Sequence, residues 1–176
     1  ILKNKDFKCV VLCGGLGSRL LPLSLHKNKA MLEVAGKPIL GHVVEYWKKY
    51  TNDFIFLVHY KKEDIVEYVK TLPIKSECIE VKELKGIADG LKYAKNAIHD
   101  NFVAVLGDCI LKGEFNFPEN FHHGVGVWDT KNHDNIKRSF SVEHENNKIT
   151  KVIEKPKIIS NNLCGMGCYF FNKKIF

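Results

Sequence analysis

The stretch VVLCGGLGSRLLPLSLHKNKAMLEVAGKP, Val10–Pro38, decides how the rest of the chain is interpreted. It opens with the apolar run Val10–Cys13 and then breaks into the glycine-rich segment Gly14–Arg19. This order is typical of a buried β-strand that ends in a phosphate-binding loop, because glycine lets backbone N–H groups approach an anion without a Cβ in the way. Arg19 and Lys29 add full positive charges nearby. The stretch therefore predicts a phosphate site at the end of the first strand.

The composition of the chain is that of a globular protein. It has 176 residues, of which 45% are hydrophobic and 27% are charged, enough for one domain with a sizeable core. No apolar run approaches the ~20 residues that span a bilayer. The first residues, ILKNKD, carry charge where a signal peptide would be apolar. We expect no membrane association.

Charge and cysteine content narrow the function classes. The net charge is +7, with lysines scattered along the chain. Since aromatic-interleaved RNA motifs and arginine-rich helices are absent from the sequence, a small anionic substrate fits better than nucleic acid. Most of the six cysteines lie in apolar runs, and the lone C-x3-C of Cys164 and Cys168 lacks a second pair at zinc spacing. We expect reduced thiols and a cytoplasmic protein.

Up to Asp108, apolar runs alternate with amphipathic segments. The expected strands are Lys8–Leu12, Phe54–Val58, Cys78–Val81 and Phe102–Leu106, and the expected helices begin at Pro38, near Lys62 and at Ile87. Strands that are apolar throughout, separated by helices, predict an α/β fold: a mostly parallel, Rossmann-like sheet flanked by helices in three α/β/α layers.

After Asp108 the pattern changes to alternating polar and apolar residues. Val125–Trp128 predicts a strand, and segments 139–144 and 148–153 around Asn146-Asn147 predict a β-hairpin insertion. Met166–Phe171 predicts a last strand, with a helix beginning at Asn172. We expect one domain.

Three kinds of phosphate loop compete for the glycine segment. A dinucleotide-binding turn needs a third glycine where Leu20 stands, and an acid after its second strand, where His59–Lys61 follows instead. A P-loop needs Gly-Lys-Ser/Thr, which is missing here. The whole pattern, G-G-x-G-S-R-L with Pro22, Ser24, Lys29, Val34 and Gly36-Lys37-Pro38, resembles the sugar-1-phosphate nucleotidylyltransferase family. Its members make nucleoside-diphosphate sugars from a nucleoside triphosphate and a sugar phosphate.

Later segments extend the resemblance over essentially the whole chain. Gly86–Leu91 is similar to the family's turn facing the base, and Val105–Asp108 to its strand ending in Gly-Asp. Glu154-Lys155-Pro156 matches the family's E-K-P motif, and Gly167–Phe171 resembles its G-x-Y-x-F strand. The resemblance implies the nucleotide-diphospho-sugar transferase fold and nucleotidyl transfer with release of pyrophosphate.

The resemblance also implies roles for individual residues. Arg19 and Lys29 are the expected catalytic residues, and Asp108 the expected ligand of Mg²⁺. The expected nucleotide-binding residues are Leu12, Gly14, Gly15, Gly17, Ser18, Glu83 and Gly86, and the expected acceptor-binding residues are Gly107, Arg138, Glu154, Lys155 and Gly167. The partners would be a nucleoside triphosphate and a small phosphorylated acceptor, without nucleic acid or membrane. The oligomeric state stays open, a homo-oligomer included.

Four positions depart from the family pattern. Asn28 stands where members usually carry Pro, and Val81 where uridine and thymidine enzymes often have Gln. Val cannot pair with a base, whereas Glu80 or Glu83 could accept from the amine of cytosine, so UTP, TTP and CTP stay open. Arg138-Ser139 replaces a sugar-binding Tyr-Gly, which leaves the acceptor open and brings Arg138 in as a reader of an anionic or polar group.

The fourth departure concerns a second metal carboxylate, which in the family lies well downstream of the G-x-Y-x-F strand. We therefore expect a single nucleotidyltransferase domain over 1–176 that is incomplete at its C-terminus. Two alternatives remain: a cytidylyltransferase acting on a non-sugar phosphate, and a non-catalytic, nucleotide-binding regulatory module with the same loop.

Overall fold

The computed structural model describes residues 7–15, 17, 21–83, 85–115 and 123–176. The chain packs into two compact units: unit 1 comprises Ile1–His123 and Phe170–Phe176, and unit 2 comprises Gly124–Tyr169. We describe each by itself. Within the described residues, no helix is long and apolar enough to cross a membrane.

A parallel sheet forms the centre of unit 1. Its strands follow the order β5 (Lys75–Glu80), β4 (Asp53–Val58), β1 (Lys8–Leu12) and β6 (Asn101–Leu106). All three neighbouring pairs are parallel, and Val10 of β1 lies between Ile55 and Ala104. Val10 is fully buried, as the apolar sequence of a strand covered on both faces requires. The predicted strands are confirmed, except that β5 lies a few residues earlier than expected.

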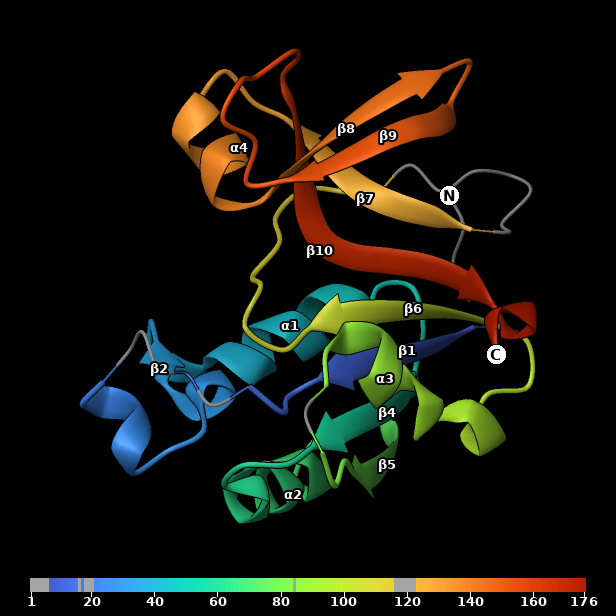
Figure 1. The fold of residues 1–176 in the computed structure, drawn as a ribbon. Helices are drawn as coiled ribbons and strands as arrows, with labels where there is room; N and C mark the ends of the chain where they lie inside the picture. The colour runs from blue at the N-terminus through green and yellow to red at the C-terminus, as the bar shows by residue number, and fades with distance from the viewer. Residues whose placement is uncertain (1–6, 16, 18–20, 84, 116–122) are drawn as a thin grey trace. The chain divides into compact units, whose positions relative to one another are not determined.

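Three helices flank this sheet: α1 (Ile39–Trp47), α2 (Lys62–Lys70) and α3 (Ile87–Lys92). In Figure 1, α1 lies behind the strands and α3 in front of them. The predicted beginnings are confirmed, and α1 starts directly after its N-cap Pro38. α3 is shorter than predicted and gives way to the 3-10 turn η4 (Lys95–Ala97), although the expected inward residues Leu91, Ala94 and Ile98 are all buried.

Short elements that the sequence did not predict follow the glycine segment. They are the 3-10 turns η2 (Leu23–Leu25) and η3 (Lys29–Met31) and the two-residue strands β2 (Glu33–Val34) and β3 (Lys37–Pro38). Elements of two or three residues are too short to show a hydrophobic period.

The end of the chain completes the core of unit 1. Phe170 packs against Trp47 and Phe115, with ring centroids 6.4 and 5.6 Å apart, and Trp47 stacks on Phe115 at 5.6 Å. Phe176 stacks on Phe102 at 5.6 Å. Each such aromatic pair adds about 0.5–1.5 kcal/mol beyond the burial of its area.

Unit 2 is built from β7 (Gly124–Asp129), α4 (His133–Arg138), β8 (Phe140–Glu145), β9 (Lys148–Glu154) and the first part of β10 (Leu163–Asn172). β8 and β9 are antiparallel, and β10 pairs with both β7 and β8. Asn146 and Asn147 join β8 to β9 with φ of 49° and 62°, the left-handed pair of a tight hairpin turn. The predicted hairpin is confirmed.

The predicted fold class is therefore confirmed: a mostly parallel sheet flanked by helices, with hairpin strands in the second half. β10 belongs to both units, because its residues from Phe170 onward are part of unit 1, where β10 follows β6 in the strand order. The helix expected at Asn172 is the single 3-10 turn η5 (Lys173–Ile175), capped by the Asn172 side chain. One domain over 1–176 stays a prediction.

Candidate active site

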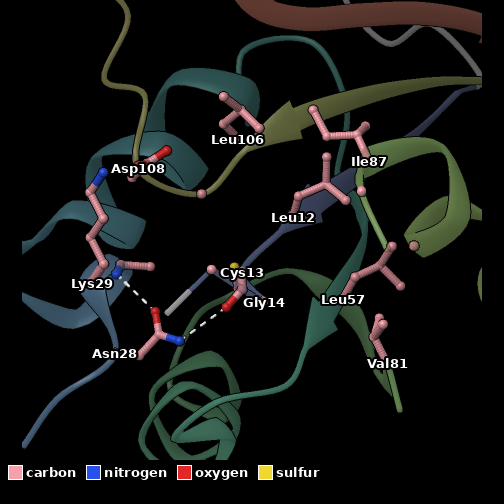
Figure 2. Close-up of a pocket in the computed structure, with 15 residues that line it drawn as sticks. Leu12, Cys13, Gly14, Asn28, Lys29, Leu57, Val81, Ile87, Leu106 and Asp108 are labelled. Carbon is pink, nitrogen blue, oxygen red and sulfur yellow. Dashed lines mark hydrogen bonds and ion pairs between the residues drawn. The ribbon is translucent and has the colours of Figure 1, made fainter. Parts of the chain in front are cut away.

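A cavity of about 330 Å³ lies in unit 1 where β1 and β6 end. Figure 2 shows the side chains that converge on it from the glycine segment, η3, the start of α3 and the residues after β6. The lining residues are Leu12, Cys13, Gly14, Gly15, Asn28, Lys29, Ala30, Leu57, Val81, Gly86, Ile87, Gly90, Leu106, Gly107 and Asp108. The C-terminal ends of parallel strands are where ligands bind in open α/β sheets.

The cavity brings together most of the residues expected at the nucleotide site. Leu12, Gly14 and Gly15 line it from the end of β1, and Gly86 lines it from the N-cap of α3 with φ of 107°. Gly107 lines it after β6, where a Cβ would lie 2.8 Å from the Cys13 Sγ. Gly107 is therefore required by the close approach of the two strand ends.

The later expected residues of the glycine segment are Gly17, Ser18 and Arg19. Gly17 does not line the cavity but has φ of +64°, and a Cβ there would lie 3.1 Å from the Ser24 Cβ and 3.2 Å from the Lys29 Cβ. The buried Ser24 hydroxyl donates to the Gly17 carbonyl at 2.8 Å. Ser18 and Arg19 lie outside the described residues.

Lys29 and Asp108 form an ion pair at one end of the cavity. Lys29 comes from η3, Asp108 follows β6, and both side chains are about one-third exposed. Figure 2 shows the two side chains pointing toward one another. A cation and an anion thus stand at the same place in the site, the first suited to a phosphate and the second to a metal ion.

Asn28 is the polar residue that the sequence did not bring into the site. It is 1% exposed, and its Nδ2 donates to the carbonyls of Cys13 at 3.0 Å and Tyr60 at 2.7 Å. Its Oδ1 accepts from the Ala30 N–H at 2.9 Å, which caps η3. The one available signal was that Asn is a favoured N-cap residue.

The opposite end of the cavity is apolar. Leu57, Val81 and Ile87 line it, and Val81 is 2% exposed. Glu83 does not line the cavity and pairs with Lys85. Glu80 pairs with Lys62 through a hydrogen bond that holds the pKa of its carboxyl below the usual range. Neither carboxylate is placed to receive a base amine in this cavity.

Cys13 is a further residue that sequence reasoning did not bring into the site. Burial raises the pKa of its thiol, and Cys78 and Asp108 raise it further. The thiol is thus neutral and packs below the strand end as a small apolar group. Ala30, Leu57, Ile87, Gly90 and Leu106 are lining residues without chemical groups that a motif could single out.

The other expected acceptor residues lie in unit 2. The Lys155 N–H donates to the Ser139 carbonyl at 2.8 Å, which places the end of β9 beside the end of α4, where Arg138 lies. The exposed Lys155 and Glu154 side chains approach each other at 3.8 Å. Lys155 has φ of 45° and Gly167, in β10, has φ of 66°. The left-handed region is uncommon for lysine, and Lys61 also adopts it, with φ of 51°.

Two known proteins are similar to this chain in sequence over nearly its whole length. The "Bifunctional protein GlmU" of Methanocaldococcus jannaschii is 35% identical over 167 residues, which are 95% of this chain and 40% of that protein. A UTP–glucose-1-phosphate uridylyltransferase, AglF, of Haloferax volcanii is 32% identical over 180 residues, covering 96% of this chain and 73% of that protein. The chain thus spans about two-fifths of the length of the GlmU relative.

Solved structures share the fold. A putative glucose-1-phosphate thymidylyltransferase from Bacillus anthracis matches with a TM-score of 0.81 at 24% identity, over 96% of this chain and 72% of that one. An inositol-1-phosphate CTP transferase from T. maritima matches with a TM-score of 0.80 at 22% identity, over 96% and 71%. A family model described as nucleotidyl transferase matches residues 8–176. The chain belongs to the nucleotidyl transferase family.

Proposed function

We propose that this chain transfers a nucleoside monophosphate from a nucleoside triphosphate to a sugar 1-phosphate or a similar small phosphomonoester, with release of pyrophosphate. The observation that carries the proposal is the convergence of Gly14-Gly15, Lys29, Gly86 and Asp108 on one cavity. These residues come from four separate segments, and together they offer backbone donors, a cation and a metal-binding carboxylate. Family membership and the names of the relatives support the same reaction.

The residues of the cavity provide positioning and charge stabilisation. In the proposed reaction an acceptor phosphate oxygen attacks the α-phosphorus in line, and the bond to pyrophosphate breaks. The N–H groups of the glycine segment hold the triphosphate. Lys29 offsets the repulsion between the two anionic reactants, and Arg19 draws charge toward the pyrophosphate. Gly86 and the apolar end of the cavity hold the nucleoside.

Mg²⁺ is the proposed metal, and Asp108 its proposed ligand. Among the described residues no group of three or more His, Cys, Asp or Glu side chains could enclose a metal. The single carboxylate of Asp108 fits Mg²⁺, which is commonly held by one or two carboxylates together with substrate phosphates and water. When bound, Mg²⁺ would neutralise charge on the phosphate oxygens.

The acceptor is proposed to bind at the end of β9 in unit 2. Lys155 would bind its phosphate, and Glu154, Arg138 and Gly167 would contact the rest of it. Gly107 stays a proposed acceptor-binding residue. The Lys155–Ser139 hydrogen bond supports this grouping within unit 2. We further propose one nucleotidyltransferase domain over 1–176 and a cytoplasmic setting.

A pyrophosphate-release assay tests the function. Each of the four nucleoside triphosphates is combined with a panel of sugar phosphates and other phosphomonoesters, with Mg²⁺ present and absent. D108N and R19A should lose at least about 99% of the turnover while the circular dichroism spectrum stays that of wild type. Wild-type rates in both variants would contradict the assignment.

The same panel separates the remaining alternatives. Because the side chains at the apolar end of the cavity cannot pair with a base, the base is held by shape and backbone contacts. Turnover confined to CTP and a non-sugar phosphate would identify the cytidylyltransferase. Tight nucleotide binding without pyrophosphate release under any combination would identify a regulatory module.

A further inference from the structure

We propose that Asn28 is a positioning residue that fixes Lys29 relative to the glycine segment. This inference rests on the proposed function, because it assigns Asn28 a part in placing the charge that acts on the phosphates. Asn28 lies directly before Lys29, and its side chain reaches three different segments of unit 1.

The buried amide of Asn28 makes three hydrogen bonds. Asn28 Nδ2 donates one hydrogen bond to the Cys13 carbonyl, at the end of β1, and the other to the Tyr60 carbonyl, after β4. Oδ1 accepts from Ala30. All the donors of this amide and one acceptor site are used, in a residue that is 1% exposed. Such a residue is locked, since each alternative rotamer would leave buried groups unpaired.

These bonds connect the end of β1 to the turn that carries Lys29. Figure 2 shows Asn28 between Cys13 and the turn that carries Lys29. The Cys13 carbonyl directly precedes the amide of Gly14, which lines the cavity. In a trans peptide the Gly14 N–H points away from the Cys13 carbonyl, so the bond from Asn28 to this carbonyl also fixes the direction of the Gly14 N–H. The same side chain therefore orients the start of the loop and the start of η3.

A similar side-chain bond holds the glycine segment at Gly17. Ser24 Oγ donates to the Gly17 carbonyl, and Tyr60 Oη donates to the carbonyls of Ser24 at 3.3 Å and Leu25 at 3.2 Å. Tyr60 is also the residue whose carbonyl Asn28 binds. Segment 21–28 is thus hydrogen-bonded to Cys13, to Gly17 and to Tyr60. Lys29 directly follows this segment, and its side chain pairs with Asp108.

The consequence is a specific kinetic signature. Displacing a reacting group by about 1 Å costs up to about 100-fold in rate, whereas binding of the whole nucleotide depends on many contacts besides Lys29. N28A removes all three bonds without adding charge, whereas N28D keeps the acceptor for Ala30 but sets a carboxylate against the Cys13 and Tyr60 carbonyls. We expect N28A to lower kcat by about 10- to 100-fold while KM for the nucleoside triphosphate changes by less than about threefold. N28D should lower kcat at least as much, and its added negative charge should also raise KM.

A matched control separates positioning from stability. Thr51 is also a buried polar residue whose side chain bonds a carbonyl, that of Phe7, at 2.6 Å, and it does not line the cavity. T51V removes that bond with little change of shape. T51V should lower the melting temperature as N28D does and leave kcat unchanged. An equal loss of kcat in T51V, or an unchanged kcat in folded N28D, would overturn the proposal.

A second readout does not depend on turnover. Acylation of Lys29 by an N-hydroxysuccinimide ester, followed by mass spectrometry without substrate, reports how firmly Lys29 is held on Asp108. The rate should rise about threefold in N28A and N28D and stay unchanged in T51V. An unchanged Lys29 rate in both Asn28 variants would also overturn the proposal. If wild-type protein releases no pyrophosphate, the proposed function fails, while the acylation rates still decide the role of Asn28.

Discussion

Lys29 and Asp108 neutralise each other at one end of the cavity of unit 1. Each is proposed to act on a different ligand, Lys29 on the triphosphate and Asp108 on Mg²⁺. Either ligand must therefore break the ion pair in order to bind. Binding of the triphosphate to Lys29 leaves Asp108 available for Mg²⁺, and binding of Mg²⁺ to Asp108 leaves Lys29 available for the triphosphate. The ion pair couples the binding of the metal to the binding of the nucleotide.

The coupling predicts that removal of Lys29 strengthens binding of the metal alone. In K29Q, Asp108 has no cation to release and the metal meets no ammonium group, so affinity for Mn²⁺ in the absence of nucleotide should rise about tenfold. Titration calorimetry measures this affinity. K37Q is the control, because Lys37 is about as exposed as Lys29, also pairs with a carboxylate, that of Glu45, and does not line the cavity. The idea is wrong if both variants bind Mn²⁺ like wild type, or if D108N still binds it normally.

Gly17 offers a second test of how Lys29 is held. G17A places a methyl group 3.1–3.2 Å from the Cβ atoms of Ser24 and Lys29, on a backbone with φ of +64°. We expect about 1–2 kcal/mol lower unfolding free energy and at least tenfold slower pyrophosphate release. Gly36 has a φ of +74° with nothing within 4 Å, so G36A should show the strain without the kinetic loss. Equal kinetic losses in the two variants would remove the contact with Lys29 as the cause.

Replacing Lys155 should change stability and activity in opposite directions. Its φ of 45° is unfavourable for a lysine, so K155G should raise the unfolding free energy by about 0.5 kcal/mol. The same change removes the proposed phosphate contact, and KM for the acceptor should rise at least tenfold with KM for the triphosphate unchanged. Urea unfolding and steady-state kinetics measure both. N147G, at a hairpin position with φ of 62°, should gain stability and keep its kinetics; a K155G protein that behaves like N147G refutes the acceptor role.

Cys13 predicts how stability changes with pH. Its thiol pKa is raised in the folded protein, whereas in the unfolded chain it ionises near its ordinary value of about 8.5. Above that pH the unfolded state binds fewer protons, so the unfolding free energy falls by up to about 1.4 kcal/mol per pH unit for this group. Urea unfolding between pH 7 and 10 should show a shallower fall in C13A. Parallel curves for wild type and C13A would show that Cys13 does not carry the effect.

The sequence predicted the elements whose apolar residues form a run or a regular pattern. It missed the elements with few buried residues and the contacts between segments that are far apart in the chain. β1, β4 and β6 were found because both of their faces are buried, whereas α4 was missed because Ile136 is its single buried residue. Lys29 and Asp108 were each chosen from a motif, but their ion pair joins segments far apart in the chain. Asn28 was noted only as a departure from Pro, since its two donated bonds reach backbone groups far away in the chain. Only its bond to Ala30 is local.

The division of β10 between the units has a consequence for how the protein is made. Unit 1 is interrupted by all of unit 2, and its core includes Phe170 and Phe176, which follow unit 2 in the sequence. Trp47 and Phe102 therefore lack these aromatic neighbours until the ribosome has made unit 2. Unit 2 is continuous in sequence, so its hairpin strands form local pairs early. Synthesis thus favours an order in which the hairpin of unit 2 pairs before unit 1 has all of its core residues.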